Sequence, residues 1–150
     1  MSDLKNKVVL ISGANGALGS AVADKARALG GELVLLDIKV PENPLQGDRW
    51  FELDLSDEAA VNSAAAEIAS VDVMFHVAGG FDMGPTVYDL SKDSLDHLFE
   101  MNVTTFHNLA RAFIPGMVKQ GNGSVVTIGA LGAVTGLANM APTVSQKVRS

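Results

Sequence analysis

Residues 7–19 read KVVLISGANGALG, an apolar run followed directly by a glycine-rich turn. The run Lys7–Ser12 is apolar without alternation, which predicts a strand buried on both faces of a parallel sheet. The next stretch, Ala17–Leu29, has apolar residues at helical spacing and ends before Gly30 and Gly31, which predicts a helix. A strand, a tight turn and a helix in this order indicate the first unit of an α/β fold.

The rest of the chain repeats this alternation of strand and helix signals. Short connections between them imply parallel strands joined by right-handed crossovers. We therefore expect a doubly wound parallel sheet with helices on both faces. The further strands expected are Leu33–Asp37, Trp50–Asp54, Val71–Val77 and Ser124–Ile128; the further helices are Asp57–Ser70, with Ser56 as its N-cap, and two stretches within Ser91–Gln120 that break or bend near Pro115.

Length and composition limit the possible partners. A chain of 150 residues with 47% hydrophobic residues can form one domain with a real core. Its 11 Lys and Arg against 17 Asp and Glu give a formal charge of −6, which argues against nucleic acid or an anionic membrane as a partner. There is no cysteine, and no stretch approaches the roughly 20 apolar residues of a membrane span. These features predict one cytoplasmic α/β domain over residues 1–150.

The glycine-rich turn is the first candidate binding site. Its glycines Gly13, Gly16 and Gly19 do not follow the G-x-G-x-x-G fingerprint of dinucleotide-binding folds. Their position between a buried strand and a helix nevertheless suits a pyrophosphate, because glycines let the backbone approach it and the helix N-terminus offers free N–H groups. The alternative is a glycine-rich connection that binds no ligand.

Asp37 closes the second expected strand, 18 residues after Gly19. A carboxylate at this point accepts hydrogen bonds from the ribose hydroxyls of an adenosine and repels a 2′-phosphate. It therefore predicts NAD as the cofactor, with NADP less favoured, and the nearby Lys39 softens that repulsion. The alternative is an aspartate that caps a helix or a loop.

These residues resemble the short-chain dehydrogenase/reductase family along nearly the whole chain. Five features occur in the family's order: the turn Gly13–Gly19, Asp37, the pair Asp54-Leu55, the pair Ala78-Gly79, and Asn102. His76 and Val77 stand where the family usually has two asparagines. The resemblance implies a Rossmann-like sheet of order 3-2-1-4-5, in which the Asp54 position binds the adenine amino group and Leu55 packs near the ring. The positions implied to contact the cofactor are Gly13, Asn15, Gly16, Ala17, Leu18, Gly19, Asp37, Ile38, Asp54, Leu55, Val77, Ala78, Gly79 and Ile128.

In this family a nicotinamide ring exchanges a hydride with an alcohol or ketone carbon, while a tyrosine transfers the hydroxyl proton. The family's Ser, Tyr and Lys positions fall on Ala130, Thr143 and Lys147, and Asn102 stands where the family holds a water that relays protons to the lysine. An aliphatic hydroxyl is far too weakly acidic to replace a tyrosine tuned to the working pH. We therefore expect an oxidoreductase by family whose chain, as written, lacks activity. The alternative is a non-catalytic dinucleotide-binding or structural module.

Residues 141–150 show no helical pattern and little likeness to the family. A compatible set of codons for Pro142–Ser150, read from the third base, encodes a Tyr-x-x-x-Lys sequence, so we expect a frame-shifted tail in place of the family's catalytic helix. The strands that normally follow the fifth would then be missing. An uncovered edge strand invites association, which predicts a homo-oligomer through Ser124–Ile128 or the helix Asn102–Gln120.

Two further patterns bear on the site. His97 lies four residues after Asp93 and three before Glu100, so these side chains could meet on one helix face. No third strong ligand is evident and a solvated polar face explains the pattern, so we expect no metal. The loop Gly79–Pro85 follows the fourth strand at the edge where such sheets bind ligands, and it is either a substrate contact or a flexible connector.

Overall fold

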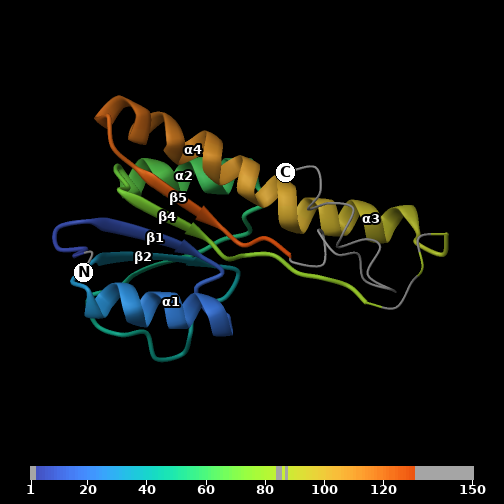
Figure 1. Ribbon diagram of the computed structural model, residues 1–150, viewed down its shortest axis with the longest axis horizontal. Helices are drawn as coiled ribbons and strands as arrows, with labels where there is room; N and C mark the ends of the chain where they lie inside the picture. The colour runs from blue at the N-terminus through green and yellow to red at the C-terminus, as the bar shows by residue number, and fades with distance from the viewer. Residues whose placement is uncertain (1–2, 84–85, 87, 131–150) are drawn as a thin grey trace.

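The computed structural model describes residues 3–83, 86 and 88–130 of the chain (Figure 1). Within them a five-stranded parallel sheet has the order β3-β2-β1-β4-β5, which confirms the predicted topology. Observed strand ends differ from the expected ones by at most two residues. The elements are β1 (Val8–Ser12), α1 (Ala17–Ala28), β2 (Glu32–Asp37), β3 (Arg49–Glu52), α2 (Glu58–Ile68), β4 (Val73–His76), α3 (Lys92–Phe99), η1 (Glu100–Thr104), α4 (Thr105–Gln120) and β5 (Ser124–Thr127).

Helices cover both faces of the sheet. In Figure 1, α1 lies on one side of the sheet, and α2 and α4 lie together on the other. The α2 and α4 side packs one apolar core that includes Leu10 and Leu109, and the α1 side packs a second core that includes Ile11 and Ala23. The helix α3 continues the line of α4 and extends away from the sheet (Figure 1).

The strand β1 lies at the centre of the sheet, between β2 and β4. Val9, Leu10 and Ile11 are fully buried, and alternate side chains enter the two cores. A strand covered on both faces needs no polar side, which is why its sequence is an unbroken apolar run. Its carboxyl end leads directly into the turn Gly13–Gly19.

Asp72, just before β4, joins the beginnings of β1 and β4. Its carboxylate accepts a hydrogen bond from the Val8 amide at 2.9 Å and pairs with the Lys7 ammonium at 3.1 Å. The Val8 hydrogen bond lowers the pKa of the Asp72 carboxyl, partial burial opposes this, and Lys7 lowers the pKa further. The central strand pair is therefore fixed by charge at one end and by apolar packing along its length.

The N-cap of α2 is Asp57, not the expected Ser56. The Asp57 carboxylate accepts hydrogen bonds from the amides of Ala59 at 2.9 Å and Ala60 at 3.1 Å. The Ser56 hydroxyl instead donates to the Asp54 carboxylate at 2.8 Å. Aspartate and serine are comparable N-caps, so the competing acceptor on Asp54 decides between them.

The helix is not broken near Pro115; a bend there, the other expected outcome, stays a prediction. Pro115 lies inside an uninterrupted α4, on its exposed side, where the carbonyl that loses its N–H partner faces solvent. The irregularity is a π-helical turn, η1, between α3 and α4. There the Asn102 amide donates to the Leu98 carbonyl at 3.0 Å and the Thr105 hydroxyl donates to the Met101 carbonyl at 2.8 Å. Side chains that bond to carbonyls one turn back compete with the backbone pattern and favour such a turn.

The edge strand β5 differs from the rest of the sheet. All four of its residues are exposed, Val125 to 39% and Val126 to 41%. Across residues 3–83, 86 and 88–130, no helix is long and apolar enough to cross a membrane. The expected frame-shifted tail, 141–150, lies outside the described residues.

Candidate functional site

A cleft of about 780 Å³ opens beside the carboxyl ends of β1, β2 and β4. This is the edge at which doubly wound sheets bind ligands. Every position implied to contact the cofactor lines this cleft except Ile128. Six further residues line it: Lys39, Ser56, His97, Glu100, Met101 and Thr105. Segments from five parts of the sequence thus meet at one concave site.

The glycine-rich turn forms the floor between β1 and α1. Gly13 has φ of +69°, and a Cβ on it would lie 2.7 Å from the Ala78 amide nitrogen. A Cβ on Gly19 would lie 2.0 Å from the Gly13 carbonyl oxygen. Glycine is therefore required at both positions, because the turn is packed against α1 and against the segment after β4.

The first turn of α1 faces this cleft with its backbone N–H groups. Its N-cap is Gly16, which makes no side-chain capping bond, and no acidic residue lies in the first turn. Free N–H groups and the partial positive charge of the helix end favour an anion at this point. The residues that line the cleft here are Gly16 to Gly19, so a phosphate group fits the chemistry of the turn.

Asp37 lies at the end of β2 on the rim of the cleft. One oxygen of its carboxylate accepts the Asn15 amide at 3.0 Å, and the other accepts the Lys39 amide at 3.3 Å. The Asn15 side chain donates in turn to the Lys39 carbonyl at 3.1 Å. These contacts hold a carboxylate beside the glycine-rich turn, at the place where a ribose joined to that pyrophosphate would lie.

Leu55 and Asp54 form another wall of the cleft. The Leu55 side chain is 5% exposed and supplies an apolar surface. Asp54 is exposed, and its Oδ1 atom accepts hydrogen bonds from both the amide and the hydroxyl of Ser56, each at 2.8 Å. An apolar side chain next to an oriented carboxylate suits a flat ring that carries an amino group.

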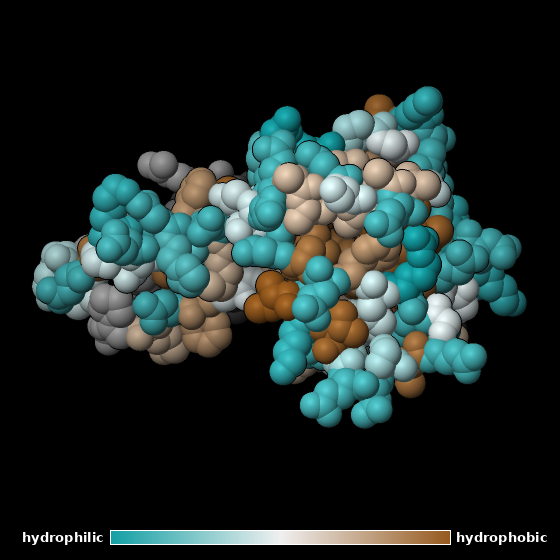
Figure 2. All heavy atoms as spheres, turned by 180° about the vertical axis from the view of Figure 1, so that it is seen from behind, coloured by the Kyte–Doolittle hydropathy of each residue, from teal (hydrophilic) through white to brown (hydrophobic). Residues whose placement is uncertain are grey.

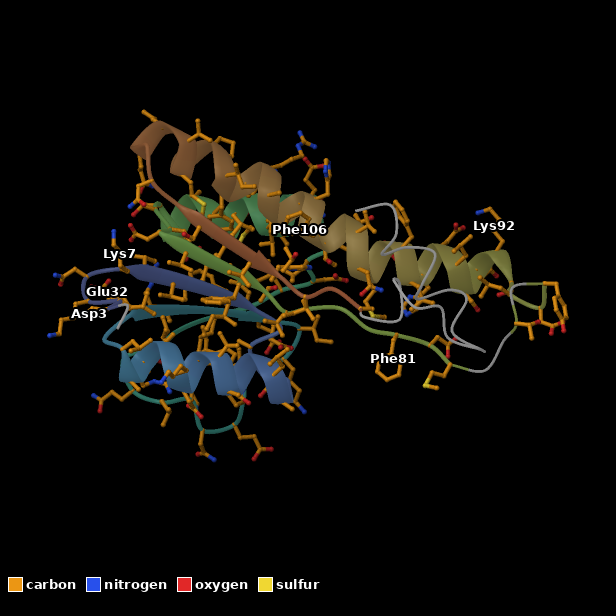
Figure 3. The ribbon with its side chains drawn as sticks, viewed as in Figure 1. Asp3, Lys7, Glu32, Phe81, Lys92 and Phe106 are labelled. Atoms are coloured by element: carbon orange, nitrogen blue, oxygen red, sulfur yellow. The ribbon has the colours of Figure 1, made fainter. Side chains whose placement is uncertain are left out.

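The segment after β4 supplies the opposite wall, Val77 to Gly79. The Ser12 hydroxyl lies 2.8 Å from Nδ1 of the buried His76, and the Ala78 amide donates to the same hydroxyl at 3.4 Å. The His76 ring contacts Phe106 of α4, with 5.4 Å between ring centroids, and Figure 3 shows Phe106 between α4 and the sheet. A histidine thus occupies a position where the family usually has an asparagine, and it holds the same wall in place.

Asn102 lies in the π-helical turn and joins the end of α3 to the wall formed after β4. Its Oδ1 atom accepts the Gly80 amide at 3.0 Å, while its Nδ2 atom donates to the Leu98 carbonyl at 3.0 Å. A Cβ on Gly79 would lie 2.7 Å from the same Oδ1 atom. This close packing fixes the Asn102 side chain beside the cleft. Beyond it, Phe81 points away from the body of the molecule (Figure 3) and is 67% exposed.

Two further expected site residues that the structure describes, Ile128 and Ala130, are not among those that line the cleft. Ile128 is 45% exposed and does not line the cleft, so its contact with a cofactor stays a prediction. Ala130 follows β5 and is half-buried, with a side chain that carries no polar group. Thr143 and Lys147 lie outside the described residues.

Sequence reasoning missed the contribution of the α3–α4 region to the cleft. His97, Met101 and Thr105 all line it. Their spacing of four residues places them on one helix face. This periodicity was available in the sequence as a signal. Within the described ranges, no group of three His, Asp or Glu side chains is placed to hold a metal ion.

Comparison with known proteins identifies the family. The family model described as Enoyl-(Acyl carrier protein) reductase matches residues 13–148. The chain belongs to the short-chain dehydrogenase/reductase family. It is 32% identical over 152 residues to a protein named Short chain dehydrogenase prhI of Penicillium brasilianum, covering 92% of this chain and 58% of that protein. It is 28% identical over 157 residues to 7alpha-hydroxysteroid dehydrogenase of Escherichia coli (strain K12), covering 96% of this chain and 61% of that protein.

Solved structures agree with this assignment. A short chain dehydrogenase/reductase family protein superposes with a TM-score of 0.91 at 25% identity, covering 99% of this chain and 65% of that chain. The chain spans 54–61% of the length of the curated relatives it matches. Members of this family are oxidoreductases that use NAD(P). The close-packed glycine turn, the free helix N-terminus and the two rim carboxylates fit such a dinucleotide.

Proposed function

We propose that this chain binds NAD in preference to NADP, within a protein that transfers a hydride between the nicotinamide ring and an alcohol or ketone. The observation that carries the proposal is the cleft. It joins the bare N-terminus of α1 to the carboxylates of Asp37 and Asp54. One anion site and two hydrogen-bond acceptors in the same cleft suit a pyrophosphate, a ribose and an adenine.

Each part of the cleft has a proposed task. The N–H groups of the turn Gly13–Gly19 receive the pyrophosphate, and Asp37 accepts hydrogen bonds from the adenosine ribose hydroxyls. Asp54 accepts a hydrogen bond from the adenine amino group, and Leu55 packs against the ring. The carboxylate of Asp37 also repels a 2′-phosphate, which is the reason for the preference for NAD. When bound, the dinucleotide supplies the hydride acceptor or donor.

The catalytic positions support a chain that binds the cofactor without turnover. The family's proton-transferring tyrosine corresponds to Thr143, and its substrate-holding serine corresponds to Ala130. Asn102 is fixed at the cleft by Gly80 and Leu98, as a water-holding residue would need to be. Lys147 is spaced four residues after Thr143. Without an acidic hydroxyl at position 143, general acid–base catalysis has no proton donor.

A second candidate is a dinucleotide-binding or structural module with no catalytic role. The same residues favour it, because they remove the proton-transfer groups while the cleft keeps the glycine-rich turn and the carboxylates of Asp37 and Asp54. A protein whose residues after Ala141 are read in the alternative frame separates the two candidates. We expect NAD-dependent turnover of a secondary alcohol from that form, and turnover about 10²-fold or more slower from the present chain. Equal rates from the two forms contradict the role assigned to position 143; no turnover from either favours the module.

We further propose that the protein forms a homo-oligomer and is located in the cytoplasm. The uncovered strand β5 and the helix α4 favour a homo-oligomer, because exposed apolar edge strands associate. The formal charge of −6 favours a small-molecule substrate over nucleic acid or an anionic membrane. We also propose a cytoplasmic location; the 150 residues contain no cysteine, so no disulfide argues for an oxidising compartment.

A further inference from the structure

Asn108 makes an unusual contact for a residue of a core helix. It lies on α4, is 5% exposed, and does not itself line the cleft. Its Nδ2 atom donates to the Leu55 carbonyl at 3.0 Å and to the Ser56 carbonyl at 3.1 Å. A buried amide nitrogen that donates to two consecutive carbonyls fixes that stretch of backbone.

The chemistry of the partners decides how the Asn108 amide is oriented. Both partners are carbonyl oxygens, which only accept hydrogen bonds. If the amide were turned over, Oδ1 would face two other acceptors. The –NH₂ group therefore points at the loop, and no water or other side chain is needed to join α4 to it.

The loop held by Asn108 is the one that presents Asp54 and Leu55 to the cleft. Ser56 connects the two groups: its carbonyl accepts from Asn108, and its amide and hydroxyl both donate to Oδ1 of Asp54. Within the described residues, no hydrogen bond reaches the other oxygen of Asp54, Oδ2. The carboxylate is thus held by one oxygen, and Asp54 is one of the residues that line the cleft. Its direction depends on where Ser56 is held.

We infer that Asn108 is a positioning residue that sets the selectivity of the cleft for adenine. This inference rests on the proposed dinucleotide function. Adenine presents an amino group, which donates to a carboxylate, whereas hypoxanthine presents a carbonyl oxygen in its place, which a carboxylate repels. A loop fixed by Asn108 keeps the Asp54 carboxylate where it distinguishes the two; a loosened loop does not.

The test compares two dinucleotides on matched variants. Asn108→Asp keeps the shape of the side chain but replaces the two donors with an acceptor; Asn108→Ala removes the donors without adding charge, and serves if the first variant does not fold. Phe113→Leu is the control, because Phe113 lies on the same helix, is also 5% exposed, and has an apolar side chain that makes no hydrogen bond to the loop. Affinities for NAD and for its hypoxanthine analogue are measured by calorimetry, with thermal unfolding of each variant alongside.

We expect the unsubstituted protein to bind NAD about tenfold or more tightly than the analogue, since a carboxylate facing a carbonyl oxygen is unfavourable. In Asn108→Asp and Asn108→Ala the ratio falls to within about twofold. In Phe113→Leu the ratio of the two affinities stays as in the unsubstituted protein, even if its unfolding temperature falls as much as that of the Asn108 variants. A general loss of stability lowers both affinities together and leaves the ratio unchanged, so the ratio separates positioning from stability.

Two results overturn the inference alone: an unchanged ratio in both Asn108 variants, or an equal fall in Phe113→Leu. Equal binding of the two dinucleotides by the unsubstituted protein also overturns it, because Asp54 then recognises no amino group. If the unsubstituted protein binds neither dinucleotide, the proposed function fails and the inference fails with it.

Discussion

The strands β1 and β5 have similar sequences and opposite surroundings. Both are short runs of aliphatic residues with a serine at one end. In β1 the residues Val9, Leu10 and Ile11 are fully buried, whereas in β5 Val125 and Val126 are about 40% exposed. Seen from behind, hydrophobic atoms gather near the middle of the molecule while hydrophilic atoms dominate both ends (Figure 2). An apolar strand sequence therefore does not by itself determine burial. The elements packed on either side of the strand determine it.

The two strands also differ in the function we expect each to affect: β1 leads into the cofactor cleft, whereas β5 lies at the edge expected to associate with another chain. The centre of the sheet carries the glycine-rich turn and the cleft. The β5 edge carries none of the cleft-lining residues. Changes at β1 should therefore alter stability and cofactor binding, and changes at β5 should alter association.

The largest contrast is expected from a pair of truncations. Leu10→Ala removes a fully buried side chain and should lower the free energy of unfolding by about 3 kcal/mol or more. Val126→Ala, on a strand whose residues are exposed, should lower the free energy of unfolding by less than about 1 kcal/mol. Urea unfolding of both variants at one protein concentration measures the difference. Equal losses contradict the contrast between the two strands.

A smaller effect is expected at Asp72, which joins β1 to β4. Asp72→Asn should lower the free energy of unfolding by about 1–2 kcal/mol near neutral pH, because the charged hydrogen bonds to Val8 and Lys7 are weakened. The folded-state pKa of Asp72 is lowered, so its contribution is present above the unfolded pKa of about 4 and is lost as the pH falls through the folded value. Unfolding measured from pH 7 down to pH 3 should show the two proteins converging. A constant gap over that range contradicts the assigned cause.

Val126→Lys should have the smallest effect on folding stability of these variants. It should have a clear effect on self-association. A lysine on an exposed edge strand should change the free energy of unfolding by no more than about 0.5 kcal/mol. It should reduce self-association, because charged side chains on edge strands oppose pairing. Sedimentation over a range of concentrations measures this, and Val118→Lys on the exposed face of α4 tests the other expected interface. If both variants associate like the original protein, neither β5 nor α4 forms the interface.

The sheet could be predicted from sequence because its signals are local and repeated. Buried parallel strands are apolar on both faces, and the turns between them carry glycine, aspartate or proline. The cap of α2 could not be predicted, since Ser56 and Asp57 are both good caps and the choice depends on Asp54 across the loop. The π-helical turn was missed for a similar reason: it depends on side chains of Asn102 and Thr105 that bond one turn back.

Most of the candidate site could be predicted because its residues follow strands. Glycines after β1, Asp37 after β2, Asp54 after β3 and Ala78 after β4 must meet at one edge of a parallel sheet. The helical contribution of His97, Met101 and Thr105 was not predicted, since helix residues reach the cleft only through the placement of α3 and α4. The contact from Asn108 was also missed, because nothing in the sequence pairs a helix amide with carbonyls more than fifty residues earlier.

The central claim is that the cleft binds a dinucleotide and that Asp37 selects NAD. It is tested most directly by calorimetric titration of NAD and NADP into the unsubstituted protein and into Asp37→Ala. We predict that NAD binds the unsubstituted protein about tenfold more tightly than NADP, and that the gap narrows in Asp37→Ala because the carboxylate no longer repels the 2′-phosphate. Equal affinities for the two cofactors in the unsubstituted protein, or binding of neither, would contradict the claim.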